Sequence, residues 1–247
     1  MRAINTVVER DIQEIIGDSH IFKEFQDKTI LVTGATGLIG SMVARSLVAA
    51  NDAYHLSLHV ICHVRNIEKA HSMFGDILNS QAIIFVDGPL DSLTVACDYI
   101  MHGAAPTKSK YFVEHPVDTI RTSIHGTERM LELGKEQRIL GMVYLSSMEQ
   151  YGIPYESGQV MTEDRIGYLD HLNVRSSYSE SKRMCECYCK SYAVEFGVPV
   201  KIARLAQTFG AGSHNMPWMV VILSFILRAI PCQTSAILRM QCGPLLF

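Results

Sequence analysis

The sequence contains little charge and no strongly basic segment. Charged residues make up 19% of its 247 residues, and the formal net charge is −3 at pH 7. Lys and Arg do not cluster with aromatic residues, so nothing in the sequence favours nucleic acid as a partner. Residues 1–17 carry charges throughout and lack the apolar core of a signal peptide. We therefore expect a cytoplasmic protein whose cysteines are reduced.

Long hydrophobic runs are absent as well. The most apolar segment, Trp218–Leu227 (WMVVILSFIL), has ten residues, whereas a helix needs about 20 to span a bilayer. We therefore expect neither a membrane-spanning segment nor a membrane partner.

The cysteines form no pattern that favours a metal site. Cys185, Cys187 and Cys189 alternate, but side chains on a helix advance by about 100° per residue, so Cys187 would point away from the other two. We expect all three to be packing residues. Because 48% of the residues are hydrophobic, a chain of this length can bury an α/β core without a disulfide or a metal ion.

What the sequence does contain is a glycine-rich turn between an apolar strand and a helix. Thr29–Thr33 (TILVT) is short and β-branched, as in a strand buried on both faces. Gly34, Gly37 and Gly40 follow, and a helix with an apolar face begins directly after them. Glycine allows the sharp turn and lets a pyrophosphate approach the backbone, and the helix start offers free N–H groups. This order predicts a dinucleotide site; the alternative is an ordinary turn.

The rest of the chain alternates between predicted strands and helices. Four further apolar segments are typical of strands: residues 56–64, 82–86, 98–102 and 142–146. Residues 117–138 and 178–196 have helical periodicity, and residues 1–26 indicate a helical segment that covers an edge of the core or contacts a partner. The alternation predicts an α/β fold with a parallel sheet.

Candidate cofactor ligands lie at the predicted strand ends. Arg65 follows the second strand, where NAD-binding folds place an acid for the ribose hydroxyls and an Arg accommodates the 2′-phosphate of NADP. No acid occurs at 62–65, which favours NADP, but Asn66 or His63 could still reach the ribose of NAD, so both cofactors stay open. Asp87 ends the third strand and could accept from the adenine amino group or start a turn.

Small or hydroxylated residues end the next two strands. Ala104 and Ala105 would let the backbone lie against the cofactor, and Ser146 or Ser147 lies where open α/β sheets place their ligands.

Tyr178 and Lys182 are four residues apart at the start of a predicted helix, so they share one face. A free phenol has a pKa near 10, but an adjacent ammonium favours the phenolate. Tyr178 could then act as acid or base on a carbinol oxygen while hydride moves to or from a nicotinamide. The alternative is a surface pair that contributes a few tenths of a kcal/mol to helix stability.

Several motifs together resemble those of the extended short-chain dehydrogenase/reductases: GATGLIG, HGAAP, YLSSMEQYG, YSESK and ARLAQTFG. Residues 28–210 are similar to the NAD-dependent epimerase/dehydratase family, whose members act on nucleotide sugars. The resemblance implies a Rossmann-type doubly wound parallel sheet and an NAD or NADP cofactor. It places the dinucleotide on the glycine loop, at Gly34, Thr36, Gly37, Leu38, Ile39 and Gly40.

The resemblance also implies catalytic roles. Alignment on Tyr151-Gly152 places Ser147 at the family's catalytic Ser/Thr, with Tyr178 and Lys182 as the other two members. Lys182 would also hold the nicotinamide ribose. Family chemistry begins with oxidation of the sugar's C4 hydroxyl to a ketone and then diverges into epimerisation, dehydration or decarboxylation.

Met148 and Glu149 narrow these outcomes. In 4,6-dehydratases the two residues after the Ser/Thr are Asp and Glu, and a thioether cannot protonate a leaving hydroxyl, so dehydration is disfavoured. Glu149 is compatible with decarboxylase-like and epimerase-like sites, either in catalysis or through a supporting hydrogen bond.

The C-terminal part departs from the family. Asn215–Phe247 holds only two charged residues, Arg228 and Arg239, where the chain-wide share predicts about six. Three interpretations are a buried helix, a membrane- or partner-binding patch, and a truncated or frameshifted tail, of which we favour the last. The expected organisation is an N-terminal helical extension (1–26), a dinucleotide-binding domain (27–212) and an atypical tail (213–247) in place of a complete substrate domain.

Two functions of different class follow. The chain is either a nucleotide-sugar oxidoreductase or an NAD(P)-binding remnant or sensor that lacks a full sugar-nucleotide pocket. The helices at 117–138 and 178–196 correspond to those of a dimer interface in the family, so a homodimer is expected by resemblance.

Overall fold

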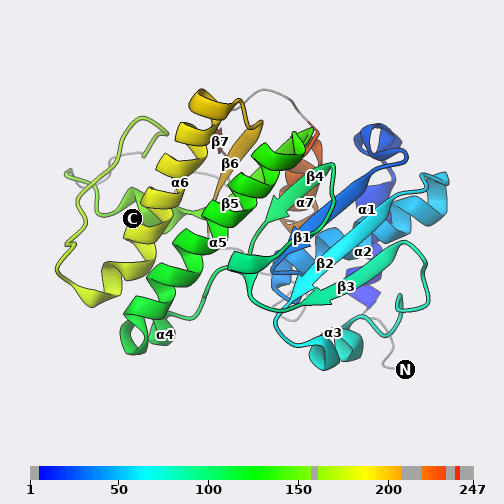
Figure 1. The fold of residues 1–247 in the computed structure, drawn as a ribbon, viewed down its shortest axis with the longest axis horizontal. Coiled ribbons are helices and arrows are strands. Elements are labelled where there is room, and N and C mark those ends of the chain that lie inside the picture. Colours follow the sequence, from blue (N-terminus) through cyan, green and yellow to red (C-terminus); the bar gives the residue numbers. More distant parts are fainter. Residues whose placement is uncertain (1–5, 157–160, 207–217, 232–236, 240–247) are drawn as a thin grey trace.

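The computed structural model describes residues 6–156, 161–206, 218–231 and 237–239. Their strands form one parallel sheet in the order β3-β2-β1-β4-β5-β6-β7 (Figure 1). The strands are β1 (Thr29–Thr33), β2 (His59–Val64), β3 (Ile83–Asp87), β4 (Tyr99–His102), β5 (Gly141–Ser147), β6 (Val200–Leu205) and β7 (Ile237–Arg239). The helices are α1 (Thr6–Ile16), α2 (Leu38–Tyr54), α3 (Ile67–Met73), α4 (Ser109–Glu114), α5 (Pro116–Gln137), α6 (Ser177–Phe196) and α7 (Trp218–Ala229).

The strand order reverses beside β1. The chain runs outward from β1 through β2 to β3, then returns to the other side of β1 and continues outward from β4 to β7. Thr33 at the end of β1 is in register with His63 of β2 and His102 of β4. Open α/β sheets bind their ligands at the carboxyl ends of the strands at such a reversal.

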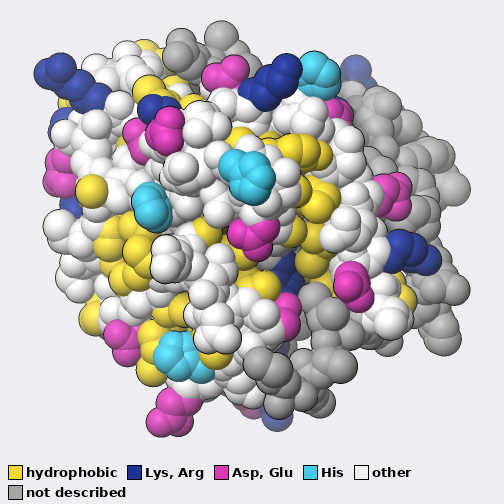
Figure 2. Space-filling view, turned by 90° about the vertical axis from the view of Figure 1, so that its right-hand side faces the viewer, with side chains coloured by type: hydrophobic (Ala, Val, Ile, Leu, Met, Phe, Trp, Pro, Cys, Tyr) yellow, Lys and Arg dark blue, Asp and Glu magenta, His cyan; other side chains and the backbone are white. Residues whose placement is uncertain are grey.

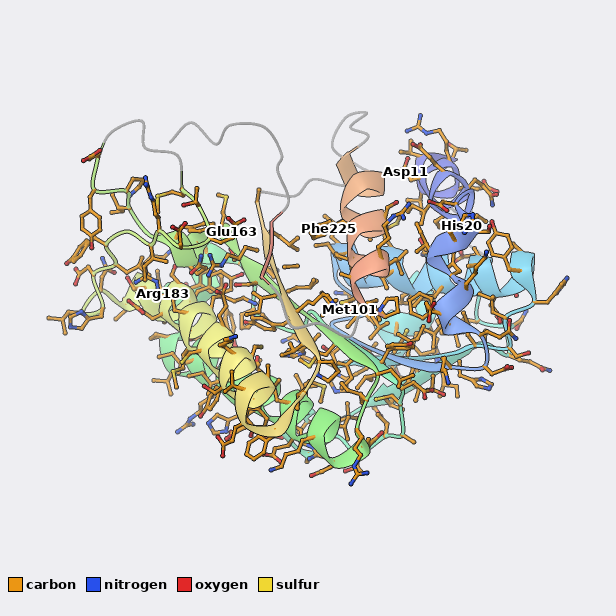
Figure 3. All side chains as sticks on the ribbon, turned by 90° about the horizontal axis from the view of Figure 1, so that it is seen from above. Asp11, His20, Met101, Glu163, Arg183 and Phe225 are labelled. Atoms are coloured by element: carbon orange, nitrogen blue, oxygen red, sulfur yellow. The ribbon has the colours of Figure 1, made fainter. Side chains whose placement is uncertain are left out.

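Helices cover both faces of the sheet (Figures 1 and 3). On one face α1, α2 and α7 pack together, and on the other α5 and α6 run side by side. Within β1, Ile30 and Val32 belong to the core beneath α2, whereas Leu31 belongs to the core beneath α5 and α6. Consecutive strand side chains point to opposite faces, which explains why this strand is apolar throughout. The predicted Rossmann-type α/β fold is confirmed.

The five predicted strands are present, but β6 and β7 are not among the predicted ones. Lys201 and Arg204 interrupt the apolar pattern of β6, yet both are buried. A buried charged side chain requires a partner that only the folded structure supplies, and for Arg204 that partner is Glu186 of α6.

The N-terminal helix covers the core, as one of the two sequence interpretations expects. Ile12 and Ile15 of α1 are buried, and α1 packs against α2 and α7. Short 3-10 turns then lead to β1 and bury Phe22 and Phe25 in the same core.

The apolar helix of the tail is also part of the core. Leu223, Ile226 and Leu227 are fully buried against the side of the sheet that carries α1 and α2. A Cβ added to Gly141 of β5 would lie 2.0 Å from the carbonyl oxygen of Ile230, so the end of this helix touches the sheet backbone. Of the three interpretations of the tail, these contacts support the buried helix. Residues 207–217, 232–236 and 240–247, which include the whole QTFGAG segment, lie outside the described residues.

Replacing Leu227 with Ala should therefore destabilise the whole fold. A large core side chain truncated to Ala typically costs about 2–5 kcal/mol, because burial is lost and a cavity remains. Arg228→Ala is the matched control, since Arg228 is exposed and pairs with Asp18 at the surface, and such pairs contribute less than about 1 kcal/mol. Urea unfolding measures both. Equal, small effects would show that α7 is not packed in the core.

Within the described ranges, no helix combines the length and hydrophobicity needed to cross a bilayer. On the face shown in Figure 2, basic and acidic side chains are interspersed, and hydrophobic side chains are exposed between them.

Candidate functional site

The glycine loop packs tightly against the end of β4. Gly34 has a φ of +70°, and a Cβ there would lie 2.8 Å from the carbonyl carbon of Gly103. A Cβ on Gly40 would lie 2.3 Å from the carbonyl oxygen of Gly34. Gly37 stands at the N-cap of α2 and supplies no side-chain cap. Two of the glycines are thus needed for close backbone contact, and the third leaves the first N–H groups of α2 free for an anion.

A cleft of about 760 Å³ opens above this loop. Six of the predicted cofactor residues line it: Gly34, Thr36, Gly37, Arg65, Ala104 and Ala105. Six others do not line it. Leu38 and Asp87 are exposed beside it, Ile39 packs against the core, Gly40 is buried behind the loop, and Tyr178 and Lys182 are not among the lining residues. The cleft fits a dinucleotide, because the glycines let a pyrophosphate come close to the backbone and the N-terminus of α2 faces the same space.

Other lining side chains carry no sequence motif and were not predicted. They are Lys69, Asp91, Lys108, Asp118, Arg121 and His125. They reach the cleft from loops and helices, where only the folded structure places them together.

A buried hydrogen-bond chain fixes the backbone below the cleft. The hydroxyl of Thr33 accepts from the N–H groups of Gly103 and Ala104 at 3.2 and 3.3 Å, and lies 2.7 Å from Nδ1 of His102. Nε2 of His102 lies 3.2 Å from the hydroxyl of Thr127, which donates to the carbonyl of Ser123 at 2.7 Å.

These contacts assign the proton positions in the chain. Because Thr33 accepts twice, its own proton goes to Nδ1 of His102, and Nε2–H of His102 then donates to Thr127. His102 is therefore held in its neutral form, and burial, helped by Lys182, lowers its pKa to about 3.

This histidine should make the protein sensitive to mild acid. The unfolded chain binds a proton at His102 near pH 6.5, whereas the folded chain does so near pH 3. Between these values the unfolded state binds more protons, so stability is full above about pH 6.5 and is lost progressively as the pH falls. His63, whose pKa burial also lowers, acts in the same direction.

We expect a His102→Gln variant to show a weaker dependence of its unfolding free energy on pH between 6.5 and 5 than the wild type. Denaturant unfolding at matched pH values measures this slope. The same change at exposed His59 is the control and should leave the slope unaltered. An unchanged slope in His102→Gln would contradict the neutral, buried assignment.

Ser147, Tyr178 and Lys182 come together at the same edge of the sheet. Ser147 is the last residue of β5, Tyr178 lies in the first turn of α6, and the hydroxyl of Ser147 is near enough to the phenol to act on its pKa. Lys182 is buried and donates from Nζ to the carbonyl of Leu145 at 2.7 Å. The same Nζ lies 5.7 Å from the ring centre of Tyr178 and 4.7 Å from that of Tyr144.

Burial dominates the electrostatics of Tyr178 and Lys182. Burial is the largest influence on Tyr178 and raises its pKa, while the hydroxyl of Ser147 acts in the opposite direction. Burial also lowers the pKa of Lys182 to about 8. In the chain without cofactor, desolvation of Tyr178 therefore outweighs the effect that we expect from the ammonium of Lys182.

Two side chains that the sequence did not indicate hold Tyr178 in place. Phe112 of α4 stacks on its ring with centroids 4.3 Å apart and an interplanar angle of 3°. The guanidinium of Arg175 lies over the ring of Phe112, 4.9 Å from its centre. Arg175 also donates to Oε2 of Glu149 at 2.9 Å, and Ser179 donates to the same oxygen at 3.3 Å. Glu149 thus ties the end of β5 to the start of α6.

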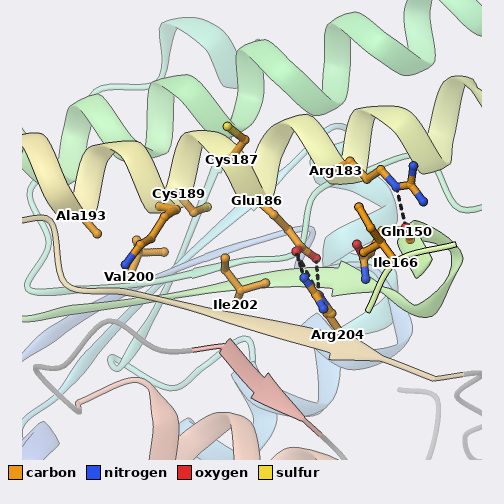
Figure 4. Close-up of a pocket in the computed structure, with 11 residues that line it drawn as sticks. Gln150, Ile166, Arg183, Glu186, Cys187, Cys189, Ala193, Val200, Ile202 and Arg204 are labelled. Carbon is orange, nitrogen blue, oxygen red and sulfur yellow. Dashed lines mark hydrogen bonds and ion pairs between the residues drawn. The ribbon is translucent and has the colours of Figure 1, made fainter. Parts of the chain in front are cut away.

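Ser146 points away from this group. Its hydroxyl donates to Oε1 of Glu186 at 2.5 Å, and Glu186 accepts from Nε and Nη2 of Arg204 at 3.0 and 2.6 Å (Figure 4). A second hollow of about 520 Å³ lies beside this pair, between α6 and β6. The structure therefore distinguishes the two serines: Ser147 faces Tyr178, and Ser146 supports a buried ion pair.

The three cysteines of α6 lie as helical geometry predicts. Cys185 and Cys189 are buried, and Cys187 is exposed. Among the residues that the structure describes, no three His, Cys, Asp or Glu side chains are arranged to hold a metal ion.

Comparisons with known proteins agree with this geometry. A family model described as the NAD dependent epimerase/dehydratase family matches residues 30–230. The match extends beyond residue 212, where we expect the dinucleotide-binding domain to end, and includes α7. UDP-glucuronic acid decarboxylase 1 of Danio rerio is 31% identical over 209 residues, which are 82% of this chain and 46% of that protein. UDP-glucuronic acid decarboxylase 6 of Arabidopsis thaliana is 32% identical over 206 residues, which are 81% of this chain and 56% of that protein. The chain spans about half the length of these relatives.

A solved structure shares the fold. The UDP-glucuronic acid 4-epimerase of Bacillus cereus, in complex with NAD, superposes with a TM-score of 0.59 at 23% identity, covering 74% of this chain and 57% of that one.

Proposed function

The chain belongs to the NAD-dependent epimerase/dehydratase family, and we propose that it binds a nicotinamide dinucleotide and oxidises the C4 hydroxyl of a nucleotide sugar. The observation that carries the proposal is that Tyr178 lies beside Ser147 and buried Lys182, at the strand edge that also carries the glycine loop. A phenol that can act as acid or base, and a helix N-terminus that can bind phosphate, lie at the same edge of the sheet. This combination suits a reaction in which hydride is transferred to a dinucleotide.

The cofactor would lie along the cleft. The free N–H groups at the start of α2 would meet its pyrophosphate, and the backbone at Ala104 and Ala105 would lie against the ribose. When bound, its nicotinamide supplies the hydride acceptor and a positive charge. That charge favours the phenolate of Tyr178, which Lys182 alone does not achieve.

The chain's own residues would then handle the proton. Ser147 accepts from the N–H of Glu149 at 3.2 Å, so its own proton is free to donate to the sugar oxygen or to Tyr178. Tyr178 would take the proton of the C4 hydroxyl. Phe112 fixes the plane of the phenol ring during this transfer.

A uronic acid sugar nucleotide is the favoured substrate. The relatives named above are UDP-glucuronic acid decarboxylases, and Glu149 stands where decarboxylase-like sites have a glutamate. A ketone at C4 lies β to a C5 carboxylate, which permits loss of CO₂. Because Glu149 is held by Arg175 and Ser179, we propose that it positions the loop and does not itself react.

Calorimetric titration tests the proposal. Purified protein is titrated first with NAD and NADP, and then, with the tighter cofactor present, with UDP-glucuronate and UDP-glucose. We expect cofactor binding, tighter binding of UDP-glucuronate than of UDP-glucose, and release of CO₂ from UDP-glucuronate. Cofactor binding without binding of any sugar nucleotide would instead support the NAD(P)-binding remnant or sensor.

We also propose a homodimer built on α5 and α6. These helices pack side by side, and Val117, Ile120 and Met184 expose apolar side chains on them. Met184→Glu should convert a dimer to a monomer by sedimentation velocity, because a buried unpaired charge is costly. A wild-type monomer would contradict the proposal, and Lys190→Glu on the same helix, outside this apolar set, is the control.

A further inference from the structure

The end of β2 presents two cations to the cleft. Arg65 directly follows the strand, and Lys69 lies one helical turn later, on α3. Both side chains line the cleft and are exposed. Neither forms a salt bridge with any side chain in the described part of the chain. Two free cations at this place match a phosphate monoester and not a neutral diol.

The side-chain oxygen of Asn66 and Nε2 of His63, which could have contacted the hydroxyls of an unphosphorylated ribose, already have partners within the chain. The side chain of Asn66 accepts from the N–H of Lys69 at 2.7 Å and so caps α3. His63 is buried, and its Nε2 lies 3.0 Å from the carbonyl oxygen of Gly88.

Three acids lie in or beside the cleft, and none stands at the end of β2; one of them, Asp118, lines the cleft from α5. Asp87 pairs in register with Val64 but is exposed and is not among the lining residues. Asp91 lines the cleft from the loop that follows β3. The acid that binds ribose hydroxyls in NAD-specific folds, at the end of the second strand, has no counterpart here.

We propose that the cofactor of this chain is NADP, with Arg65 and Lys69 holding its 2′-phosphate. The inference rests on the proposed function, in which the cleft binds a nicotinamide dinucleotide. It departs from the cofactor in the family's name, because a charge-specific contact replaces the contact to the ribose hydroxyls.

Calorimetry with NADP and NAD separates the possibilities. We expect NADP to bind at least tenfold more tightly, equivalent to about 1.4 kcal/mol. Raising the NaCl concentration should weaken NADP binding more than NAD binding, because the added contact is between exposed charges. Equal affinities, or tighter NAD, would overturn this inference and leave the proposed function standing. If neither dinucleotide binds, the proposed function itself fails.

Variants locate the contact. Arg65→Ala and Lys69→Ala should each lower the affinity for NADP about tenfold and leave that for NAD nearly unchanged. Lys110→Ala is the matched control, since Lys110 is exposed and pairs with Glu114 outside the cleft. Arg65→Asp should reverse the preference towards NAD, because a carboxylate can accept from both ribose hydroxyls. If Arg65→Ala lowers the affinity for NADP and NAD equally, with thermal unfolding unchanged, Arg65 does not contact the 2′-phosphate.

Discussion

Replacing Tyr178 with Phe is expected to abolish turnover while leaving cofactor affinity nearly unchanged. The substitution removes one oxygen and keeps the ring that stacks on Phe112 at 4.3 Å. General acid–base groups typically contribute 10²- to 10⁴-fold to rate, so the turnover number should fall by about that factor. The Michaelis constant should change little, because the lost contact is used mainly in the transition state.

The control is Tyr188→Phe on the same helix. Tyr188 packs edge-on against Tyr192, away from Ser147, and the same loss of oxygen there should leave turnover intact. Production of reduced nicotinamide under single-turnover conditions, measured by absorbance, reports the chemical step, and calorimetry reports cofactor binding. A fully active Tyr178→Phe enzyme would remove Tyr178 from its proposed role.

The pKa values explain why the cofactor matters to this residue. In the chain alone burial raises the pKa of Tyr178, and the pKa of Lys182 falls to about 8. Tyr178 is therefore a neutral phenol at neutral pH until a further cation approaches. In the proposed function this arrangement would keep Tyr178 inactive as a base until the cofactor binds, and would so link proton transfer to the presence of the hydride acceptor.

The strand, glycine turn and helix at residues 29–54 could be predicted from the sequence because their signals are local. A β-branched strand, three spaced glycines and an amphipathic helix are contiguous, and each reports its own backbone geometry. The contact of Gly34 with Gly103 is not contiguous, yet it follows from the sheet order, which places β1 beside β4. The resemblance implied a doubly wound sheet, in which the first and fourth strands are neighbours, and the close packing follows from that arrangement.

Other features could not be predicted because they depend on distant side chains. Burial of Tyr178 under Phe112 comes from α4, and it reverses the pKa shift that the spacing of Tyr178 and Lys182 suggested. The neutral state of His102 depends on hydroxyls from β1 and α5. In both cases desolvation is the largest cause of the pKa shift, and a sequence pattern does not reveal it.

Replacing Glu186 with Ala should give the largest loss of stability outside the apolar core. Glu186 and Arg204 are both nearly inaccessible, and three hydrogen bonds to Glu186 from Arg204 and one from Ser146 satisfy its carboxylate. Removing one member of a buried pair leaves an uncompensated charge and typically costs about 3–5 kcal/mol. Glu180→Ala is the matched control, because Glu180 meets Arg183 only at 3.9 Å near the surface of the same helix, and it should cost less than about 1 kcal/mol.

The double variant Glu186→Leu with Arg204→Met should recover most of the loss, since a buried ion pair replaced by apolar groups of similar volume is often neutral or stabilising. Urea unfolding of the single and double variants measures the coupling. Equal costs for Glu186→Ala and Glu180→Ala would contradict the buried pair.

The milder Glu186→Gln variant links this pair to the proposed catalysis. The charge of Glu186 raises the pKa of Lys182 against the lowering effect of burial. Without that charge the pKa of Lys182 should fall below its value of about 8, so the ammonium is lost at lower pH. The alkaline limb of the turnover profile should therefore move to lower pH in Glu186→Gln, while Glu180→Gln leaves it in place. An unmoved limb would show that Glu186 supports the fold alone.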